Sequence, residues 1–196
     1  MAEKIILFDG SNIDDFINLD GSKHKWAVEF GTMTVVPGSG NIVSKQTFGD
    51  AQLHVEFRLP YMPDCEGQYR ANSGVYIHGC YEVQVLDSFG KKTPPANDDC
   101  SAIYSLLTPE TNACLPPLEW QTYDLIIRAP RFNENGSIKE NARLTALHNG
   151  IVVHNNVELP RATPGGTSGV PVAEGPVMLQ DHGNTVAYRN IWIMKL

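Results

Sequence analysis

The chain has 196 residues, of which 22 are acidic and 15 basic, so its formal net charge is −7. The Lys and Arg residues are scattered rather than gathered into a stripe, which argues against a nucleic-acid partner. No apolar run approaches the roughly 18 residues needed to cross a bilayer, so we expect no membrane insertion. This length predicts one β-sandwich domain, spanning 1–196.

The 17 Gly and 13 Pro residues punctuate short runs rich in Val, Ile, Tyr and Phe, which is typical of an antiparallel all-β protein. The predicted strands are Ile5–Phe8, Trp26–Glu29, Thr32–Val36, Asn41–Ser44, Gln52–Leu59, Gly74–His78, Tyr81–Leu86, Thr122–Arg128, Arg143–His148, Ile151–His154, Pro176–Gln180 and Arg189–Lys195. Asn149 and Gly150 predict a hairpin turn, because both positions tolerate positive φ. A short helix over Ile13–Ile17, capped by Asn12, is a weaker expectation.

Three aperiodic segments, 60–72, 88–100 and 108–118, are predicted to be long loops, which in compact β domains are more often functional than idle. Cysteines bracket two loop-rich stretches without any C-x-x-C spacing. We expect two disulfides, Cys65–Cys80 and Cys100–Cys114, each closing a loop of about 15 residues. Four buried free thiols are the alternative.

The first predicted strand begins almost at the first residue, with no signal-peptide pattern before it. Together with the expected disulfides, this suggests an exported protein, periplasmic or extracellular, whose signal peptide has been removed. A cytoplasmic location is the alternative. The oligomeric state is left open.

The segment Tyr81–Asp87 is the strongest candidate for a functional strand. Alternation places Glu82 and Gln84 on one face and valines on the other, which suits the floor of a polar cleft. Asp87 lies five residues after Glu82, and this odd offset brings it to the same face only if a β-bulge intervenes. With a bulge, Glu82 and Asp87 would form the carboxyl pair that glycosyl chemistry often uses. A solvent-facing Glu82 and an Asx turn at Asp87 are the alternative.

Other polar side chains are candidates to surround that strand. Asn72 and Tyr76 share the polar face of the preceding strand and offer groups suited to sugar hydroxyls. Gln180 and His182 follow an apolar strand near the C-terminus, and a His can act as acid, base or metal ligand. Trp120 could stack on a sugar ring or pack in the core.

Seven motifs in order along the chain resemble the 3-keto-disaccharide hydrolase domain family. They are Leu7–Gly10, Asn72–Tyr76, Tyr81–Asp87, Pro117–Asp124, Leu147–Gly150, Gly175–Gly183 and Tyr188–Ile191. The resemblance implies a concanavalin A-like jelly roll of two antiparallel sheets with a sugar-binding concave face. The strand also resembles the E-x-D-x-x-E strand of laminarinase-like glycoside hydrolases, but Gln84 and Asp87 replace two of its acids, which disfavours plain retaining hydrolysis.

The resemblance implies an enzyme that cleaves the glycosidic bond of 3-keto-glycosides, by elimination and hydration or by hydrolysis. Such chemistry needs a base, an acid and a group that stabilises an oxyanion. Glu82, Asp87 and His182 are the expected catalytic residues, and Arg70, Arg189 or a divalent metal held by Glu82, Asp87 or His182 could stabilise the oxyanion. A non-catalytic carbohydrate-binding module is the main alternative, and a structural interaction domain a third.

Overall fold

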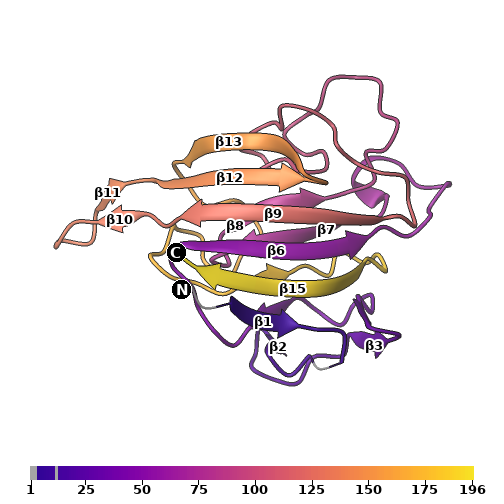
Figure 1. The fold of residues 1–196 in the computed structure, drawn as a ribbon, viewed down its shortest axis with the longest axis horizontal. Helices are drawn as coiled ribbons and strands as arrows, with labels where there is room; N and C mark the ends of the chain where they lie inside the picture. Colours follow the sequence, from indigo (N-terminus) through magenta and orange to yellow (C-terminus); the bar gives the residue numbers. More distant parts are fainter. Residues whose placement is uncertain (1–3, 12) are drawn as a thin grey trace.

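The computed structural model describes residues 4–11 and 13–196. Its strands form two packed antiparallel sheets, and the larger sheet lies in front of the smaller one in Figure 1. The larger sheet has the order β13-β12-β9-β6-β15-β4-β3, with β1 paired to the C-terminal part of β15. The smaller sheet has the order β2-β5-β14-β7-β8. The all-β jelly-roll prediction is therefore confirmed.

Each predicted strand overlaps an observed one, although β13 extends five residues further than predicted and β2, β10 and β11 were not predicted. The larger sheet contains β1 (Lys4–Phe8), β3 (Ala27–Glu29), β4 (Thr32–Thr34), β6 (Ala51–Arg58), β9 (Trp120–Arg128), β12 (Ala142–His148), β13 (Ile151–Leu159) and β15 (Ala187–Lys195). The smaller sheet contains β2 (Phe16–Asn18), β5 (Ile42–Ser44), β7 (Ser73–Ile77), β8 (Tyr81–Val85) and β14 (Met178–Leu179). A hairpin of β10 (Arg131–Phe132) and β11 (Ile138–Glu140) and the 3-10 turn η1 (Gly67–Tyr69) complete the elements.

The inner faces of the two sheets form one apolar core. Strand β6 alternates, with Leu53, Val55 and Phe57 fully buried between more exposed polar residues. Val83 and Val85 of β8 belong to the same core cluster from the other sheet. Full burial of one such side chain contributes about 1.5–3 kcal/mol, so this periodicity fixes the register of both strands.

Every residue of β7 and β8 is buried, in contrast to the alternation of β6. One face of this strand pair packs on the core, and the other is covered by loops. Because that second face carries polar side chains, those side chains must find hydrogen-bond partners under the loops. The smaller sheet thus encloses a polar environment on the side away from the core.

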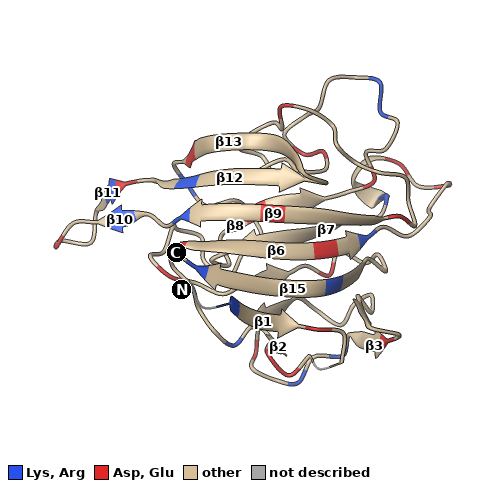
Figure 2. Ribbon diagram, viewed as in Figure 1, with Lys and Arg blue, Asp and Glu red and all other residues tan. Residues whose placement is uncertain are grey.

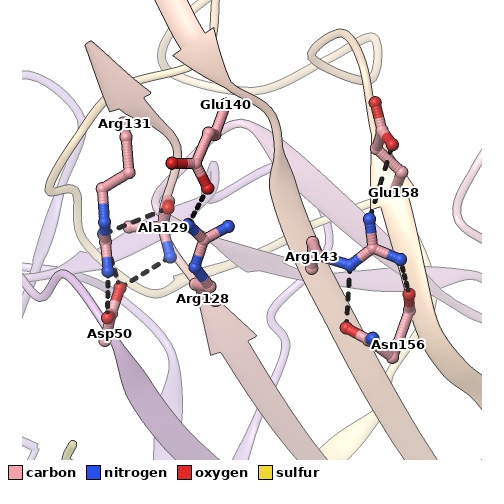
Figure 3. A network of polar contacts seen from close by, with 8 residues as sticks. All are labelled: Asp50, Arg128, Ala129, Arg131, Glu140, Arg143, Asn156 and Glu158. Carbon is pink, nitrogen blue, oxygen red and sulfur yellow. Dashed lines mark hydrogen bonds and ion pairs between the residues drawn. The ribbon is translucent and has the colours of Figure 1, made fainter.

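Ion pairs attach the β10–β11 hairpin to the end of the larger sheet (Figure 3). Arg131 pairs with Asp50, whose carboxylate also accepts the Ala129 N–H at 2.8 Å, and Arg128 pairs with Glu140. The Arg131 guanidinium holds the pKa of Asp50 below its ordinary value. These contacts position a hairpin that has few apolar residues of its own.

The predicted short helix over Ile13–Ile17 is wrong. Phe16–Asn18 is strand β2, paired with β5, rather than part of a helix, because Phe16 is buried at the edge of the smaller sheet. Its expected cap, Asn12, lies outside the described residues. No helix in the described part of the chain is long and apolar enough to cross a membrane.

The four cysteines are free, so the predicted disulfides Cys65–Cys80 and Cys100–Cys114 are also wrong. Cys80 is buried in the turn between β7 and β8, and burial raises the pKa of its thiol to about 12, which keeps the thiol protonated and unreactive. The Cys100 thiol lies 3.3 Å from the Tyr123 hydroxyl, and the Cys114 thiol donates to the Leu86 carbonyl at 3.6 Å. The disulfide argument for export is removed, and the cellular location stays a prediction.

Candidate functional site

The floor of the candidate site is the outer face of the β7–β8 pair. The register places Tyr76 opposite Glu82 and Gly74 opposite Gln84. Since Val83 and Val85 belong to the core, alternation directs Glu82 and Gln84 away from it. Gly74 leaves room for Glu82: a Cβ at residue 74 would lie only 2.3 Å from Glu82 Oε1. The predicted polar face of this strand therefore exists.

The walls of the site are two loop segments hydrogen-bonded to one edge of β8. The segment 101–104 runs along β8, with the Tyr104 N–H donating to the Glu82 carbonyl at 3.2 Å. Further along the same edge, Thr163 donates its N–H to the Cys80 carbonyl at 2.8 Å. The Thr163 hydroxyl accepts the Glu82 N–H, also at 2.8 Å. Backbone contacts thus fix both walls relative to Glu82.

These elements enclose a pocket of about 110 Å³. Six predicted site residues line it: Asn72, Tyr76, Glu82, Gln84, Gln180 and His182. Four further lining residues were not predicted: Gln68, Tyr104, Pro164 and Gly165. The structure therefore brings together most of the predicted site, from β7, β8 and the segment after β14.

Glu82 is the buried ionisable group of this pocket. Glu82 is only 3% exposed, and burial raises the pKa of its carboxyl from 4.5 to about 7, although the neighbouring Tyr76 hydroxyl partly opposes the rise. Burial and the Glu82 charge raise the pKa of Tyr76, so the phenol stays protonated, and it donates a hydrogen bond to the Pro164 carbonyl at 3.1 Å. A carboxyl group with a pKa near neutrality can both take and release a proton.

Two acceptor atoms in the pocket have no partner among the described residues: Asn72 Oδ1 and Gln180 Oε1. Asn72 is 2% exposed, and its Nδ2 donates to the Gln68 carbonyl at 2.8 Å. Gln180 Nε2 donates to the Tyr76 hydroxyl at 3.3 Å. Buried unpaired acceptors are costly, so these atoms favour a ligand that brings hydroxyl donors.

His182 lies in an exposed turn at the mouth of the pocket. Asp181 shapes this turn, since its carboxylate accepts the N–H groups of Gly183 and Gly40, both at 2.9 Å. The Asp181 N–H in turn donates to Asn41 Oδ1 at 2.9 Å. The imidazole is therefore placed where a bound ligand meets solvent.

Gln68, on η1, joins the amides of the pocket. Its Oε1 lies 2.9 Å from the Gln84 amide, and its Nε2 donates to the Asp98 carbonyl at 2.8 Å. Turned the other way, the Gln84 amide donates to Glu82 Oε1 at 3.2 Å and to the Ser73 carbonyl at 3.0 Å. Gln84 therefore lies between the buried carboxyl and the outer amides.

Asp87 and Arg70 lie in a neighbouring hollow of about 290 Å³ rather than with Glu82. The β7–β8 register has no shift, and β8 ends at Val85, so the predicted bulge is absent and Asp87 follows the strand end. Its carboxylate faces Arg70 Nε at 3.4 Å. The predicted Glu82–Asp87 pair is not assembled in one pocket.

Trp120 and Arg189 lie on the opposite side of the sandwich. Trp120 pairs with Arg58, and Arg189 with Glu56, on the outer face of the larger sheet. The Arg189 guanidinium stacks 4.0 Å from the Trp120 ring and bonds Glu56 at 2.6 Å. Figure 2 shows the charged segments of β6, β9 and β15 side by side on this face. Neither residue is among those lining the pocket.

The divalent metal considered from the sequence has no assigned set of ligands among the described residues. Within residues 4–11 and 13–196, no group of three or more His, Cys, Asp or Glu side chains could hold a metal ion. Glu82 and His182 share the pocket, while Asp87 opens onto the neighbouring hollow.

Solved structures with the same fold include three that are informative. A protein from Parabacteroides distasonis described as a "putative glycosyl hydrolase" is 37% identical, with a TM-score of 0.90, over 98% of this chain and 84% of that one. A second from that organism, described likewise, has 19% identity and a TM-score of 0.72 over 98% and 94%. A Bacillus subtilis protein with a galectin-like fold has 10% identity and a TM-score of 0.52 over 100% and 98%. No curated protein is significantly similar to the chain.

Fold and neighbours together define a β-sandwich of the glycosyl hydrolase type, with a polar pocket on its smaller sheet. The model of the 3-keto-alpha-glucoside-1,2-lyase-like domain matches residues 3–194. The chain belongs to this family, and the resemblance seen in its sequence is confirmed.

Proposed function

We propose that the protein cleaves the glycosidic bond of 3-keto-glycosides by elimination followed by hydration. The observation that carries this proposal is Glu82, a buried carboxyl group with a pKa near 7. It lies on the floor of a pocket whose amide and hydroxyl side chains can hydrogen-bond a hexose. The family match supports the general class of reaction. Sugar hydroxyls would satisfy the unpaired oxygens of Asn72 and Gln180.

In the first step, Glu82 takes the hydrogen on C2 as a proton, since the C3 ketone makes it acidic. The electron pair forms an enolate whose charge rests on the C3 oxygen. Among the lining side chains, the Tyr104 hydroxyl and the Gln84 and Gln180 amides can donate to that oxygen. No Lys or Arg is among the described residues that line the pocket.

In the second step, the enolate expels the C1 oxygen, which forms a C1–C2 double bond and restores the ketone. His182, at the mouth of the pocket, protonates the leaving oxygen. Water then adds at C1 and gives its proton to His182, C2 regains a proton from Glu82, and the product is the free 3-keto sugar. Proton transfer by one positioned side chain contributes roughly 10²–10⁴-fold to the rate.

The test is release of the aglycone from a 3-keto-glucoside, with the unoxidised glucoside as the matched control substrate. We expect release only from the ketone, and a loss of roughly 10²-fold or more in Glu82→Gln. No release above background across a range of pH, with and without added divalent metals, would contradict the proposal.

A carbohydrate-binding module using the same pocket predicts a different result. Such a module would bind the sugar saturably without turnover, and Glu82→Gln would leave its affinity nearly unchanged. Calorimetric titration of both proteins with the 3-keto-glucoside and its parent glucoside separates this outcome from catalysis.

A further inference from the structure

The hollow that contains Asp87 borders the pocket near the end of β8. Glu82 and Gln84 of β8 line the pocket, and Leu86, just after the end of the strand, lines the hollow. The turn η1 borders both, because Gln68 lines the pocket and Gly67 the hollow. A ligand bound at Glu82 and longer than one ring would therefore extend across η1 into the hollow.

The two spaces differ in size and in lining. The pocket, at about 110 Å³, is well below the roughly 300 Å³ at which pockets for larger ligands begin, whereas the hollow measures about 290 Å³. The hollow is lined by Gly67, Arg70, Leu86, Asp87, Ser88, Phe89, Gly90, Lys91 and Asp99. The hollow therefore offers more room than the pocket for a second ring.

The hollow presents two cations, each held by a buried carboxylate. Arg70 faces Asp87 through Nε at 3.4 Å, and Lys91 Nζ contacts both oxygens of Asp99, at 2.6 and 2.7 Å. The side chains of Asp87 and Asp99 are 4% and 9% exposed, while those of Arg70 and Lys91 are 35% and 39% exposed. The charges balance, so the hollow suits a neutral polar ligand better than an anion.

Both cations retain donors for a ligand. The hydrogen bonds and ion pairs of Arg70 with described residues all involve Nε, which leaves its two terminal amino groups, and Lys91 has one N–H beyond those facing Asp99. Beside them Phe89 is 49% exposed, an aromatic ring at the rim of a polar hollow. Polar donors next to an exposed aromatic face match the hydroxyls and C–H face of a sugar.

We propose that this hollow binds the sugar ring that leaves when the substrate is cleaved, with Phe89 against its C–H face and Arg70 and Lys91 donating to its hydroxyls. The inference rests on the proposed function, because the other ring is placed at Glu82. Residues outside the catalytic pocket would then determine which leaving groups the enzyme accepts.

The test compares two substrates, a 3-keto-disaccharide and methyl 3-keto-glucoside, whose leaving group is too small to reach the hollow. Phe89→Ala and Lys91→Ala should lower kcat/KM for the disaccharide roughly tenfold or more and leave the methyl glycoside unchanged. Lys92→Ala, an exposed neighbour outside the lining, should change neither value. Equal losses on both substrates, or no loss on either, would overturn the subsite.

A binding measurement keeps this inference separate from the proposed reaction. Calorimetry with the unoxidised disaccharide should show weaker binding to Phe89→Ala than to Lys92→Ala. If the unaltered protein cleaves neither ketone but the two variants still differ in affinity for the disaccharide, the proposed reaction is refuted and the proposed subsite is supported. Affinity unchanged by Phe89→Ala would overturn the subsite even if both ketones are cleaved.

Discussion

Glu82 combines two properties that usually exclude one another in a protein interior. The carboxyl group is almost fully buried, yet nearby groups can serve either of its protonation states. The nearby Tyr76 hydroxyl lowers the pKa of this carboxyl group, while burial raises it more strongly, to about 7. The neighbouring Gln84 amide can face Glu82 or Gln68. The residue is therefore built to change protonation state near neutral pH.

The raised pKa of Glu82 predicts a pH-dependent stability. The folded protein binds a proton that the unfolded chain releases between pH 4.5 and about 7, so this contribution is complete below pH 4.5 and is lost as the pH rises through 7. A shift of this size corresponds to on the order of 3 kcal/mol. Urea unfolding of wild type and Glu82→Gln should show their difference in unfolding free energy changing by that amount over this range.

Because other groups titrate in both proteins, only the difference between them tests the assignment. A difference that stays constant from pH 4 to 8 would show that Glu82 has an ordinary pKa. It would also remove the electrostatic basis for the proposed base.

At the level of elements, the β7–β8 pair supplies the floor of the site, and Gly74 leaves the space that the Glu82 and Tyr76 side chains occupy there. A Cβ at this position would lie 2.3 Å from Glu82 Oε1 and 3.0 Å from Tyr76 Cε2. The glycine backbone has no positive φ here, so the requirement is space rather than conformation. Gly74, which has no side chain, therefore lies against the side chains of Glu82 and Tyr76.

Gly74→Ala is therefore expected to displace the Glu82 carboxylate. Overpacking of this kind costs about 1–3 kcal/mol of unfolding free energy. A misplacement near 1 Å lowers the rate of ketone cleavage by roughly 10²-fold. Gly169→Ala is the matched control, since a Cβ there meets nothing within 4 Å and the backbone φ is not positive. If Gly74→Ala unfolds and turns over like Gly169→Ala, the close packing against Glu82 is refuted.

Strand alternation allowed the sequence to predict most of the strands and six of the ten residues that line the pocket. Residues on β7, β8 and after β14, such as Tyr76 and Glu82, were found because period-two patterns reveal which face they share. Gln68 and Tyr104 were not found, because their positions come from a 3-10 turn and from a loop paired to β8. Local sequence carries no signal for such long-range pairing.

The errors have the same origin. Asp87 was placed with Glu82 by assuming a bulge, but the register of β7–β8 is regular and the strand ends first. Trp120 and Arg189 were assigned by residue type, and sheet topology puts them on the outer face of the other sheet. Topology, rather than residue chemistry, decides which side of a sandwich a side chain occupies.

On the scale of the whole molecule, the two outer faces of the sandwich differ. The larger sheet displays ion pairs and stacked aromatic side chains, such as Arg189 on Trp120. The smaller sheet is covered by loops that enclose Glu82 within a pocket. Among the described residues of these two faces, Glu82 on the second face is almost fully buried, whereas the Glu56 side chain on the first is 18% exposed, so the proposed reaction is assigned to the second face.

The central claim is that Glu82 removes the hydrogen on C2 of a 3-keto sugar. It is tested most directly with a 3-keto-glucoside deuterated at C2, by measuring the cleavage rate and the deuterium lost to solvent. We expect slower cleavage of the deuterated substrate, loss of its deuterium to water, and neither reaction in Glu82→Gln. Cleavage at an unchanged rate with the deuterium fully retained would contradict it.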